Sequence, residues 1–420
     1  MRGLFGALAA PSRKSADAQT LDWLPGFLLD AASKTGISIN WSTALQVTAM
    51  LACCRVVGED IAVSRCSLMR PRGGGGFDVA SDHDLHQLLY LEPSEGLTAF
   101  SLWETIVFHV MLCGNAYVFI NRVGDSGRIH ELLVLEPAKV QVTRLPDRTL
   151  RYDVAGEDGG FRTVPNNLIW HIRGPSWNGW MGMETVRLVR EALGLSLALE
   201  GSHAELHSGG TKQSGVYAID GELTAKQHEQ MVTWLKRYAA AGDLSGAPMV
   251  LDRGAKWFNQ QMSGVDTEHL ATRNYQVQEV CRGVRVMPIM VGLADKVATY
   301  SSSEQMFLAH RQYTLTPWAG RLEQSGEVSL LTPADKRQGL QLRFDLDVSM
   351  RGDFKSRQEG RQIQRRNGII NANDWRAGEN LNPRSDPGGD QYIVEANMAI
   401  QDGRDLPVPA SKPATPPKEQ

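Results

Sequence analysis

Two segments carry residue types that could support hydrolysis, and each lacks a partner that the chemistry needs. Ser176 lies in a Gly-Pro-Ser-Trp-Asn-Gly run, but a nucleophile elbow requires Gly-x-Ser-x-Gly, and the second residue after this serine is Asn178. His203 and His207 are at i, i+4, yet a zinc-protease helix carries Glu directly after the first histidine, where this chain has Ala204. We therefore expect both histidines to be structural and Ser176 not to be a nucleophile.

Other candidate ligands are equally incomplete. His83 and His86 have i, i+3 spacing with no third ligand nearby, so they do not make a zinc site. The Gly-rich run 72–76 is not followed by the Lys-Ser/Thr of a phosphate-binding loop and is typical of an exposed turn. Three further carboxylates lack a nearby His or Glu: Asp345, Asp347 and Asp353. The pattern therefore predicts no catalytic residue, no metal and no cofactor, and a protein that is not an enzyme.

Composition narrows the class of protein. The chain has 420 residues, enough for more than one domain, and a net charge of −3, so it has no overall positive field for gripping nucleic acid. No apolar run reaches the roughly 18–20 residues of a membrane span, and the N-terminus has no clear signal cleavage site. The five cysteines show no metal-ligand spacing and indicate the reduced thiols of a cytosol. We expect Cys53 and Cys54 to be small buried hydrophobic residues.

The stretch 265–325 predicts a helix, a break and a second helix. Apolar residues recur in the first part at close to the spacing of one helical face. The break contains Pro288 and Gly292 as punctuation. In the second helix Pro317 removes the hydrogen bond to the carbonyl of Tyr313 and should kink the helix there. Two helices with a small, weakly charged loop between them indicate a segment with a mechanical role rather than an active site.

The first half of the chain predicts an α+β body. Helices are expected at 42–63 and in an apolar run that Thr98 or Ser101 caps and Gly114 ends. A meander should follow, with strands near 116–122, 130–136, 139–143, 150–154 and 167–173. Further on, a hairpin is expected at about 328–332 and 340–346.

A small unit is inserted between two long predicted helices. Residues 211–262 hold six Lys/Arg against five Asp/Glu, and they lie between a helix over 183–208 and a helix over 265–286. We interpret this small lobe on a two-helix stalk as a docking site for a partner. Residues 351–385, with eight Lys/Arg against four Asp/Glu, are the only clearly basic region, and either a solvated helix face or a polyanion-facing surface accounts for them.

Several stretches follow one another in the order found in a known family. They are 91–120 (LEPSEGLTAFSLWETIVFHVMLCGNAYVFI), 209–221 (GGTKQSGVYAIDG), 286–305 (VMPIMVGLADKVATYSSSEQ), 314–324 (TLTPWAGRLEQ), 344–357 (FDLDVSMRGDFKSR) and the run from Asn373 to Pro383. On these residues the chain resembles the HK97-like portal proteins of tailed double-stranded DNA phages. The family pattern has Asn at Glu92, Pro at Gln213 and Leu-Leu at Met290 and Val291.

The resemblance implies a portal fold and a ring, usually a dodecamer, at one capsid vertex of the virion, assembled in the host bacterial cytoplasm. Double-stranded DNA would be packaged through its channel by terminase and would later leave to the tail. The implied partners are further copies of the chain, the terminase large subunit, the major capsid protein, a head–tail adaptor and transiently bound DNA, with no membrane. The alternative is a minor capsid or head–tail adaptor ring protein without a DNA channel.

The family's layout also implies an order of parts. They are a flexible arm (1–40), a wing (41–182), a stem helix (183–210), a clip (211–262), a second stem helix (263–286), a tunnel loop (287–301), a kinked tunnel helix (302–325), a wing hairpin (326–350), crown helices (351–395) and a disordered proline-rich tail (396–420). The clip would face terminase and later the adaptor, and the crown would lie inside the head.

The charge balance agrees with such a conduit. Residues 265–325 hold six Lys/Arg and six Asp/Glu, and a channel through which DNA slides should not bind phosphates tightly, because each neutralised phosphate adds affinity. The residues expected at the channel are Gly292, Asp295, Lys296, Thr299 and Tyr300. Lys296, partly offset by Asp295, would form a ring of positive charge that favours weak, sequence-independent contacts. Since the chain lacks a phosphate-binding loop, ATP hydrolysis is expected of a partner motor.

Overall fold

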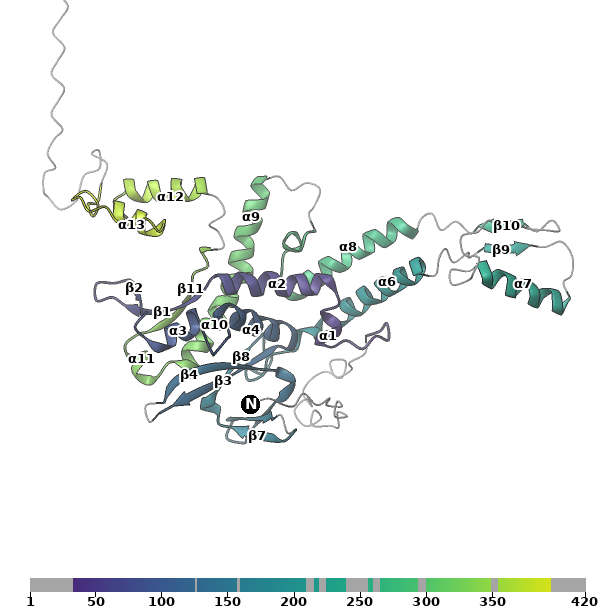
Figure 1. Ribbon diagram of the computed structural model, residues 1–420, viewed down its shortest axis with the longest axis horizontal. Helices are drawn as coiled ribbons and strands as arrows, with labels where there is room; N and C mark the ends of the chain where they lie inside the picture. The colour runs from purple at the N-terminus through teal and green to yellow at the C-terminus, as the bar shows by residue number, and fades with distance from the viewer. Residues whose placement is uncertain are drawn as a thin grey trace, which may run out of the picture. The chain divides into compact units, whose positions relative to one another are not determined.

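The computed structural model describes residues 33–124, 127–156, 159–208, 215–218, 224–238, 256–259, 265–293, 300–348 and 354–393. The chain divides into two units, Met1–Leu346 and Asp347–Gln420 (Figure 1). The tail predicted over 396–420 lies outside the described residues. Residues 33–40, expected in a flexible arm, are instead fastened, because the Lys34 amide donates to the Glu191 carboxylate at 3.0 Å and Asn40 caps the first helix.

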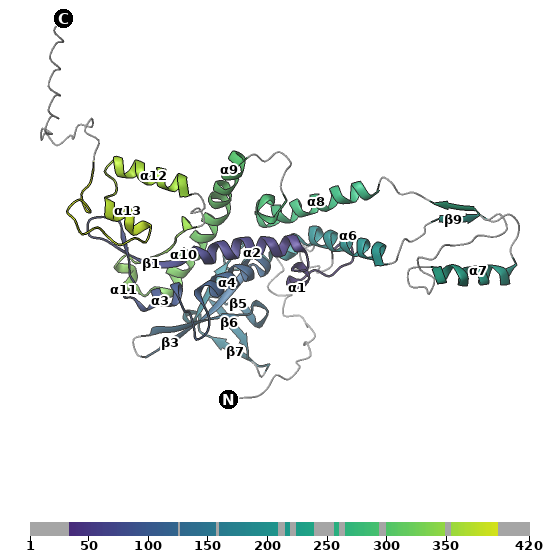
Figure 2. The ribbon, with the colours of Figure 1, turned by 45° about the horizontal axis from the view of Figure 1, so that its top comes forward.

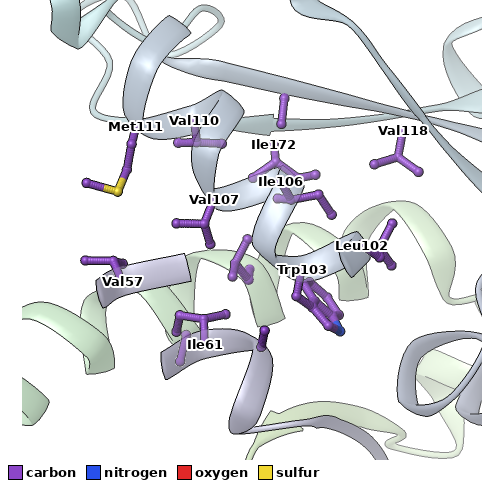
Figure 3. Packing of buried hydrophobic residues seen from close by; sticks show 14 of the residues in the cluster. Val57, Ile61, Leu102, Trp103, Ile106, Val107, Val110, Met111, Val118 and Ile172 are labelled. Carbon is purple, nitrogen blue, oxygen red and sulfur yellow. The ribbon is translucent and has the colours of Figure 1, made fainter. Parts of the chain in front are cut away.

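Helices α2 and α4 form the centre of the first unit. The helices of this region are α1 (Trp41–Ala44), α2 (Thr48–Val63), α3 (Asp84–Tyr90) and α4 (Ala99–Cys113). As expected, the Thr98 side chain accepts from the Ser101 amide at the start of α4, and Gly114 ends this helix with a φ of 73° that favours glycine. Figure 3 shows Val107 of α4 beside Val57 of α2, with Ile172 behind α4. Helix α4 is therefore buried between α2 and a sheet, and Cys53 and Cys54 are buried in the same core as predicted.

Three small antiparallel sheets surround these helices. Their strand orders are β11-β1-β2, β4-β3-β8 and β5-β6-β7. The strands are β1 (Cys66–Pro71), β2 (Phe77–Val79), β3 (Asn115–Val123), β4 (Arg128–Leu135), β5 (Val140–Arg144), β6 (Leu150–Ala155), β7 (Phe161–Val164), β8 (Ile169–Arg173) and β11 (Gln341–Phe344). The five strands expected between 116 and 173 are present, but they form two sheets rather than one meander, because β8 returns to pair with β3. The prediction missed β7, which pairs with β6.

The hairpin predicted over 326–350 is wrong. Residues 326–330 belong to helix α10 (Thr316–Leu330), and α11 (Pro333–Arg337) follows it. The remaining strand, β11, pairs antiparallel with β1, so that Leu342 lies opposite Leu68. The helix continues through Gly326 to Leu330, because Gly326 packs closely against Leu342 of β11 and its weak helix propensity is overridden by this tertiary contact. The partner of β11 is distant in the sequence, where a local pattern carries no information about pairing.

Two long helices occupy the positions predicted for the stalk. Helix α6 (Arg190–Ser208) follows the short α5 (Thr185–Leu188), and α6 runs beside α8 (Val265–Val284) in both views (Figure 2). Between them in sequence, β9 (Gly215–Ala218) pairs with β10 (Lys256–Asn259), and α7 (Ala225–Tyr238) connects these strands. None of the helices in the described ranges is both long and apolar enough to cross a membrane.

Several arginines of the second unit form hydrogen bonds and an ion pair with other residues of the same unit. It contains α12 (Phe354–Arg366) and α13 (Ala372–Gly378), and the Asn371 side chain caps α13. Arg361 donates to the carbonyl oxygens of Trp375 and Gly378, which closes the C-terminus of α13. Arg357 forms an ion pair with Glu379 at 3.1 Å. Arg365, Arg376 and Arg384 also bond to groups of this unit. Much of the basic character of 351–385 therefore serves to hold two helices together.

A buried polar network joins the core to the loop that leads into the stalk. The side-chain oxygen of Asn115 accepts from the Gly182 amide at 2.8 Å and from Nε2 of His171 at 2.9 Å, while Tyr152 donates to Nδ1 of His171 at 3.1 Å. These bonds require a neutral His171 that carries its proton on Nε2. Gly182 has no room for a side chain, since a Cβ there would lie 1.9 Å from the Gly114 carbonyl oxygen. Burial, with Arg173 nearby, lowers the pKa of His171 to about 3.

This network predicts a loss of stability in mild acid. An unfolded chain protonates His171 below its ordinary pKa of 6.5, whereas the folded chain keeps it neutral down to about pH 3, so stability falls as the pH falls between these values. By pH 4.5 the loss is about 2–3 kcal/mol. Denaturant unfolding of His171→Gln should give a lower free energy of unfolding at pH 7 and a shallower decline toward pH 4.5. Parallel pH profiles for wild type and variant would contradict the assignment.

Candidate functional site

The end of α8 and the start of the predicted tunnel loop have a defined backbone. Arg285 has a φ of 61° directly after α8 and so ends this helix. Pro288 begins the turn η4 (Pro288–Val291), and Gly292 ends it with a φ of 84°. Pro288 and Gly292 therefore begin and end the turn that the sequence predicted between the two helices. Glycine suits the left-handed conformation at 292 because a Cβ would be strained there.

Only part of the predicted channel segment lies within the described residues. Gly292 is exposed at the end of η4, and Tyr300 is the first residue of α9 (Tyr300–His310). Asp295, Lys296 and Thr299 lie outside the described residues, as does the side chain of Tyr300. Their contact with DNA remains a prediction.

The helix that follows is interrupted before the predicted proline. Residues Arg311–Leu315 form a π-helical turn between α9 and α10, and the Thr316 amide donates to the Arg311 carbonyl oxygen, five residues back. Pro317 follows at the first turn of α10, where its missing amide hydrogen is tolerated. The α-helical bonding therefore changes over 311–315, and a kink at Pro317 itself stays a prediction. A π turn of this kind often lies at a functional site.

Two tertiary hydrogen bonds hold the interrupted region against the rest of the unit. The hydroxyl of Thr314, in the π turn, donates to the Arg285 carbonyl oxygen at 2.9 Å. The buried His310, at the end of α9, contacts the carboxylate of Asp60 on α2 at 3.2 Å through Nε2. The π turn is thereby tied both to the end of the stalk helix α8 and to the core helix α2.

Helix α10 is fixed to the edge strand β11 by two carboxylates. Glu323 accepts from the Phe344 amide at 2.8 Å, and Glu327 accepts from the Leu342 amide at 3.1 Å. The i, i+4 spacing of the glutamates places them on one side of α10, opposite alternate amides of the strand. These bonds satisfy donors on the free edge of β11 that would otherwise be open to another strand. Burial raises the pKa of Glu323.

The same helix is also bound to β8 in a second sheet. The indole nitrogen of Trp170 donates to the Ser325 hydroxyl at 3.1 Å, and Arg321 donates to the Arg173 carbonyl oxygen at 2.8 Å. Burial lowers the pKa of Arg321. Gly326 allows the close approach to β11, since a Cβ there would lie 2.5 Å from Cδ1 of Leu342. Helix α10 therefore links the interrupted helix to two sheets at once.

The residues first considered for catalysis have structural partners. The Ser176 hydroxyl accepts from the Gly179 amide at 2.8 Å and donates to the Met181 carbonyl oxygen, which stabilises a turn. Nδ1 of His83 accepts from the Leu85 amide, and Nδ1 of His86 accepts from the Leu68 amide. Within the described ranges, no three His, Cys, Asp or Glu side chains are grouped to hold a metal ion.

The bonds that position the site were not among the sequence predictions. Thr314, His310, Glu323 and Glu327 contact backbone or side chains between 15 and 250 residues away. The i, i+4 spacing of the two glutamates indicates that they share one side of a helix. The strand that they contact could not be predicted, because it depends on the pairing of β11 with β1.

Comparison with known proteins places the chain in a family. A family model for phage portal proteins matches residues 48–380, and the chain therefore belongs to the phage portal protein family. It is 26% identical over 365 residues to the portal protein of Enterobacteria phage HK97, covering 86% of this chain and 84% of that protein. It is 27% identical over 414 residues to the probable portal protein of Streptomyces phage phiC31, covering 94% and 88% of the two chains.

Solved structures show the same fold. A chain in the virion of a native gene transfer agent particle matches with a TM-score of 0.54 at 19% identity, over 82% of this chain and 94% of that one. An HK97-family phage portal protein from Corynebacterium diphtheriae matches with a TM-score of 0.52 at 13% identity, over 74% and 98%. These similarities confirm the portal fold of mixed helices and sheets that the sequence predicted.

The packing of the two stalk helices makes a testable prediction. A Cβ on Gly283 of α8 would lie 2.4 Å from Cγ1 of Val189, in the turn that joins α5 to α6. Gly283→Ala should therefore force the helices apart and lower the free energy of unfolding by about 1–3 kcal/mol. The matched control is Gly201→Ala in α6, where a Cβ meets no atom within 4 Å, so that this variant should be neutral or more stable by up to about 1 kcal/mol. Equal denaturant midpoints for the two variants would rule out the close contact.

Proposed function

We propose that copies of this chain form a ring at a unique capsid vertex of a virion, and that double-stranded DNA enters and leaves through the channel of this ring. Membership of the phage portal protein family carries this proposal. A relative with the same fold was determined in the neck of a native gene transfer agent particle with C12 symmetry, at a TM-score of 0.53 and 20% identity. The ring is accordingly a dodecamer. It assembles in the cytoplasm of the host bacterium.

The parts of the chain take the following roles in this proposal. Residues 41–182 form the wing against the major capsid protein, 183–210 and 263–286 the stem, 211–262 the clip, 287–301 the tunnel loop, 302–325 the tunnel helix and 351–395 the crown. The terminase large subunit binds the clip during packaging, and a head–tail adaptor binds it afterwards. The chain itself has no enzymatic step, and the motor that hydrolyses ATP is a partner.

The contacts around the π turn suit a part that carries mechanical load. The stem helix α8 ends at Arg285, whose carbonyl oxygen accepts from Thr314 at 2.9 Å. From there α10 is bonded to β8 through Arg321 and to β11 through Glu323 and Glu327. A force on the tunnel loop is thereby transmitted to the wing through hydrogen bonds of α10 and not only through the covalent chain.

Apolar side chains next to the tunnel loop support assembly with further copies. Phe307 and Leu308 on α9 are 55% and 43% exposed, and Tyr313 in the π turn is 54% exposed. Neighbouring exposed apolar residues are typical of contact surfaces. Packing of adjacent subunits in a ring covers such residues.

Electron microscopy of the purified full-length chain tests the ring. The expected result is rings with a central hole wide enough for a DNA duplex. Closed discs would favour a minor capsid or adaptor protein that lacks a channel, and monomers at all concentrations would contradict assembly by this chain alone. Phe307→Ser with Tyr313→Ser should weaken the rings and leave the circular dichroism of the chain unchanged, because both residues are exposed.

Deletion of residues 292–298 tests the tunnel loop. We expect rings of normal size, because the bonds of α8 and α10 lie outside this segment, and we expect packaging of nuclease-protected DNA to fall at least tenfold. A variant in which 294–298 are replaced by glycine and serine at the same length separates the role of the side chains from that of chain length. Normal packaging by the deletion variant would show that this segment is not the tunnel loop.

A further inference from the structure

We propose that Cys53 and Cys281 are an oxidation site, at which an intramolecular disulfide fastens the stem helix α8 to the core helix α2. The two sulfur atoms are 3.8 Å apart, and both residues are fully buried between the helices. The cysteines lie 228 residues apart in the sequence, so their proximity is a product of the fold alone. Neither residue has a role in the portal function proposed above.

The geometry favours this pair over the neighbouring thiol. Cys54 is also buried on α2, but the thiol in contact with Cys281 is that of Cys53. A disulfide requires the sulfur atoms to approach from 3.8 Å to about 2.0 Å. The side chains of both cysteines already point into one helix–helix contact.

The reaction needs a small two-electron oxidant, and hydrogen peroxide is the class that fits a buried site. The thiolate of one cysteine attacks the O–O bond, which forms a sulfenic acid and releases hydroxide. The second sulfur then attacks the sulfenic sulfur, the S–S bond forms, and the oxygen leaves as water with the proton of the second thiol. In total, two thiols and one peroxide give one disulfide and two waters.

Burial makes the reaction slow. The contact with the Cys281 thiol, together with burial, raises the pKa of the Cys53 thiol, which keeps the Cys53 thiolate scarce at neutral pH. The pair therefore stays reduced in a thiol-rich cytosol during synthesis and oxidises over long exposure outside it. If the chain acts in a particle, as proposed above, the cross-link accumulates in the particle and stiffens the junction of stem and wing. The chemistry itself does not depend on ring assembly.

Peptide mapping of the oxidised full-length chain tests the site. The chain is incubated with hydrogen peroxide or with a reductant, then denatured, alkylated with iodoacetamide and digested with trypsin. Peroxide should produce a cross-link between the peptide that ends at Arg55 and the peptide that ends at Arg282, while Cys66 and Cys113 remain alkylated. Because the cross-link closes a long loop, the midpoint of thermal unfolding should rise by about 5 °C and return to its original value with reductant.

Single variants identify the sulfur atoms and keep the test decisive. Cys54→Ala, the matched control, should retain the cross-link and the thermal shift, and Cys53→Ala should lose both. Circular dichroism of the reduced variants shows that they are folded. A cross-link that persists in Cys53→Ala, thiols that stay fully alkylatable after peroxide, or a cross-link without a thermal shift would each overturn the proposal. Electron microscopy of the same samples reports ring formation separately, so failure of the ring and failure of the cross-link are distinguishable.

Discussion

The hydrogen bonds that Glu323 and Glu327 accept from the amides of β11 are the constraint on which the rest of the site depends. They set the position of α10 along the sheet edge, and they require β11 to pair with β1 rather than with its sequence neighbours. Another side of α10 forms hydrogen bonds with Trp170 and Arg173 of β8. A helix fastened on two sides cannot slide without breaking several bonds. The π turn directly precedes this fastened helix, so α10 anchors its C-terminal side.

The π turn connects the fastened helix α10 to the end of the stalk helix α8. Inserting one extra residue in a helical turn changes which side chains face the neighbouring helices. In this chain the change directs Thr314 toward the carbonyl at the end of α8 and leaves His310 against Asp60. Tyr313, between them in sequence, is exposed. One local departure from α-helical bonding is thus accompanied by two internal contacts and one exposed aromatic side chain.

A second junction positions the other stalk helix. The segment before α5 is pinned by Asn115, whose amide bonds to both the nitrogen and the oxygen of Gly182, and His171 holds the amide from the other side. Gly114 and Gly182 approach each other too closely for any side chain. The Gly-Asn-Ala-Tyr run that contributed to the family resemblance therefore has a physical function, namely to join the end of α4 to the entrance of the stalk.

The sequence by itself determined the local features, because caps, breakers and periodicity act over a few residues. Thr98, Gly114, Pro288 and Gly292 start or end their elements as predicted, and the strands between 116 and 173, apart from β7, were found within a few positions. The ordered motifs also identified the family. The tertiary structure alone decided the pairing of β11 with β1, the helical state of 326–330, the internal use of the arginines in 351–385 and the contact of Cys53 with Cys281. Each of these features depends on residues that come into contact only after the chain folds. Such contacts cannot be predicted from the spacing of residues within a short stretch of sequence.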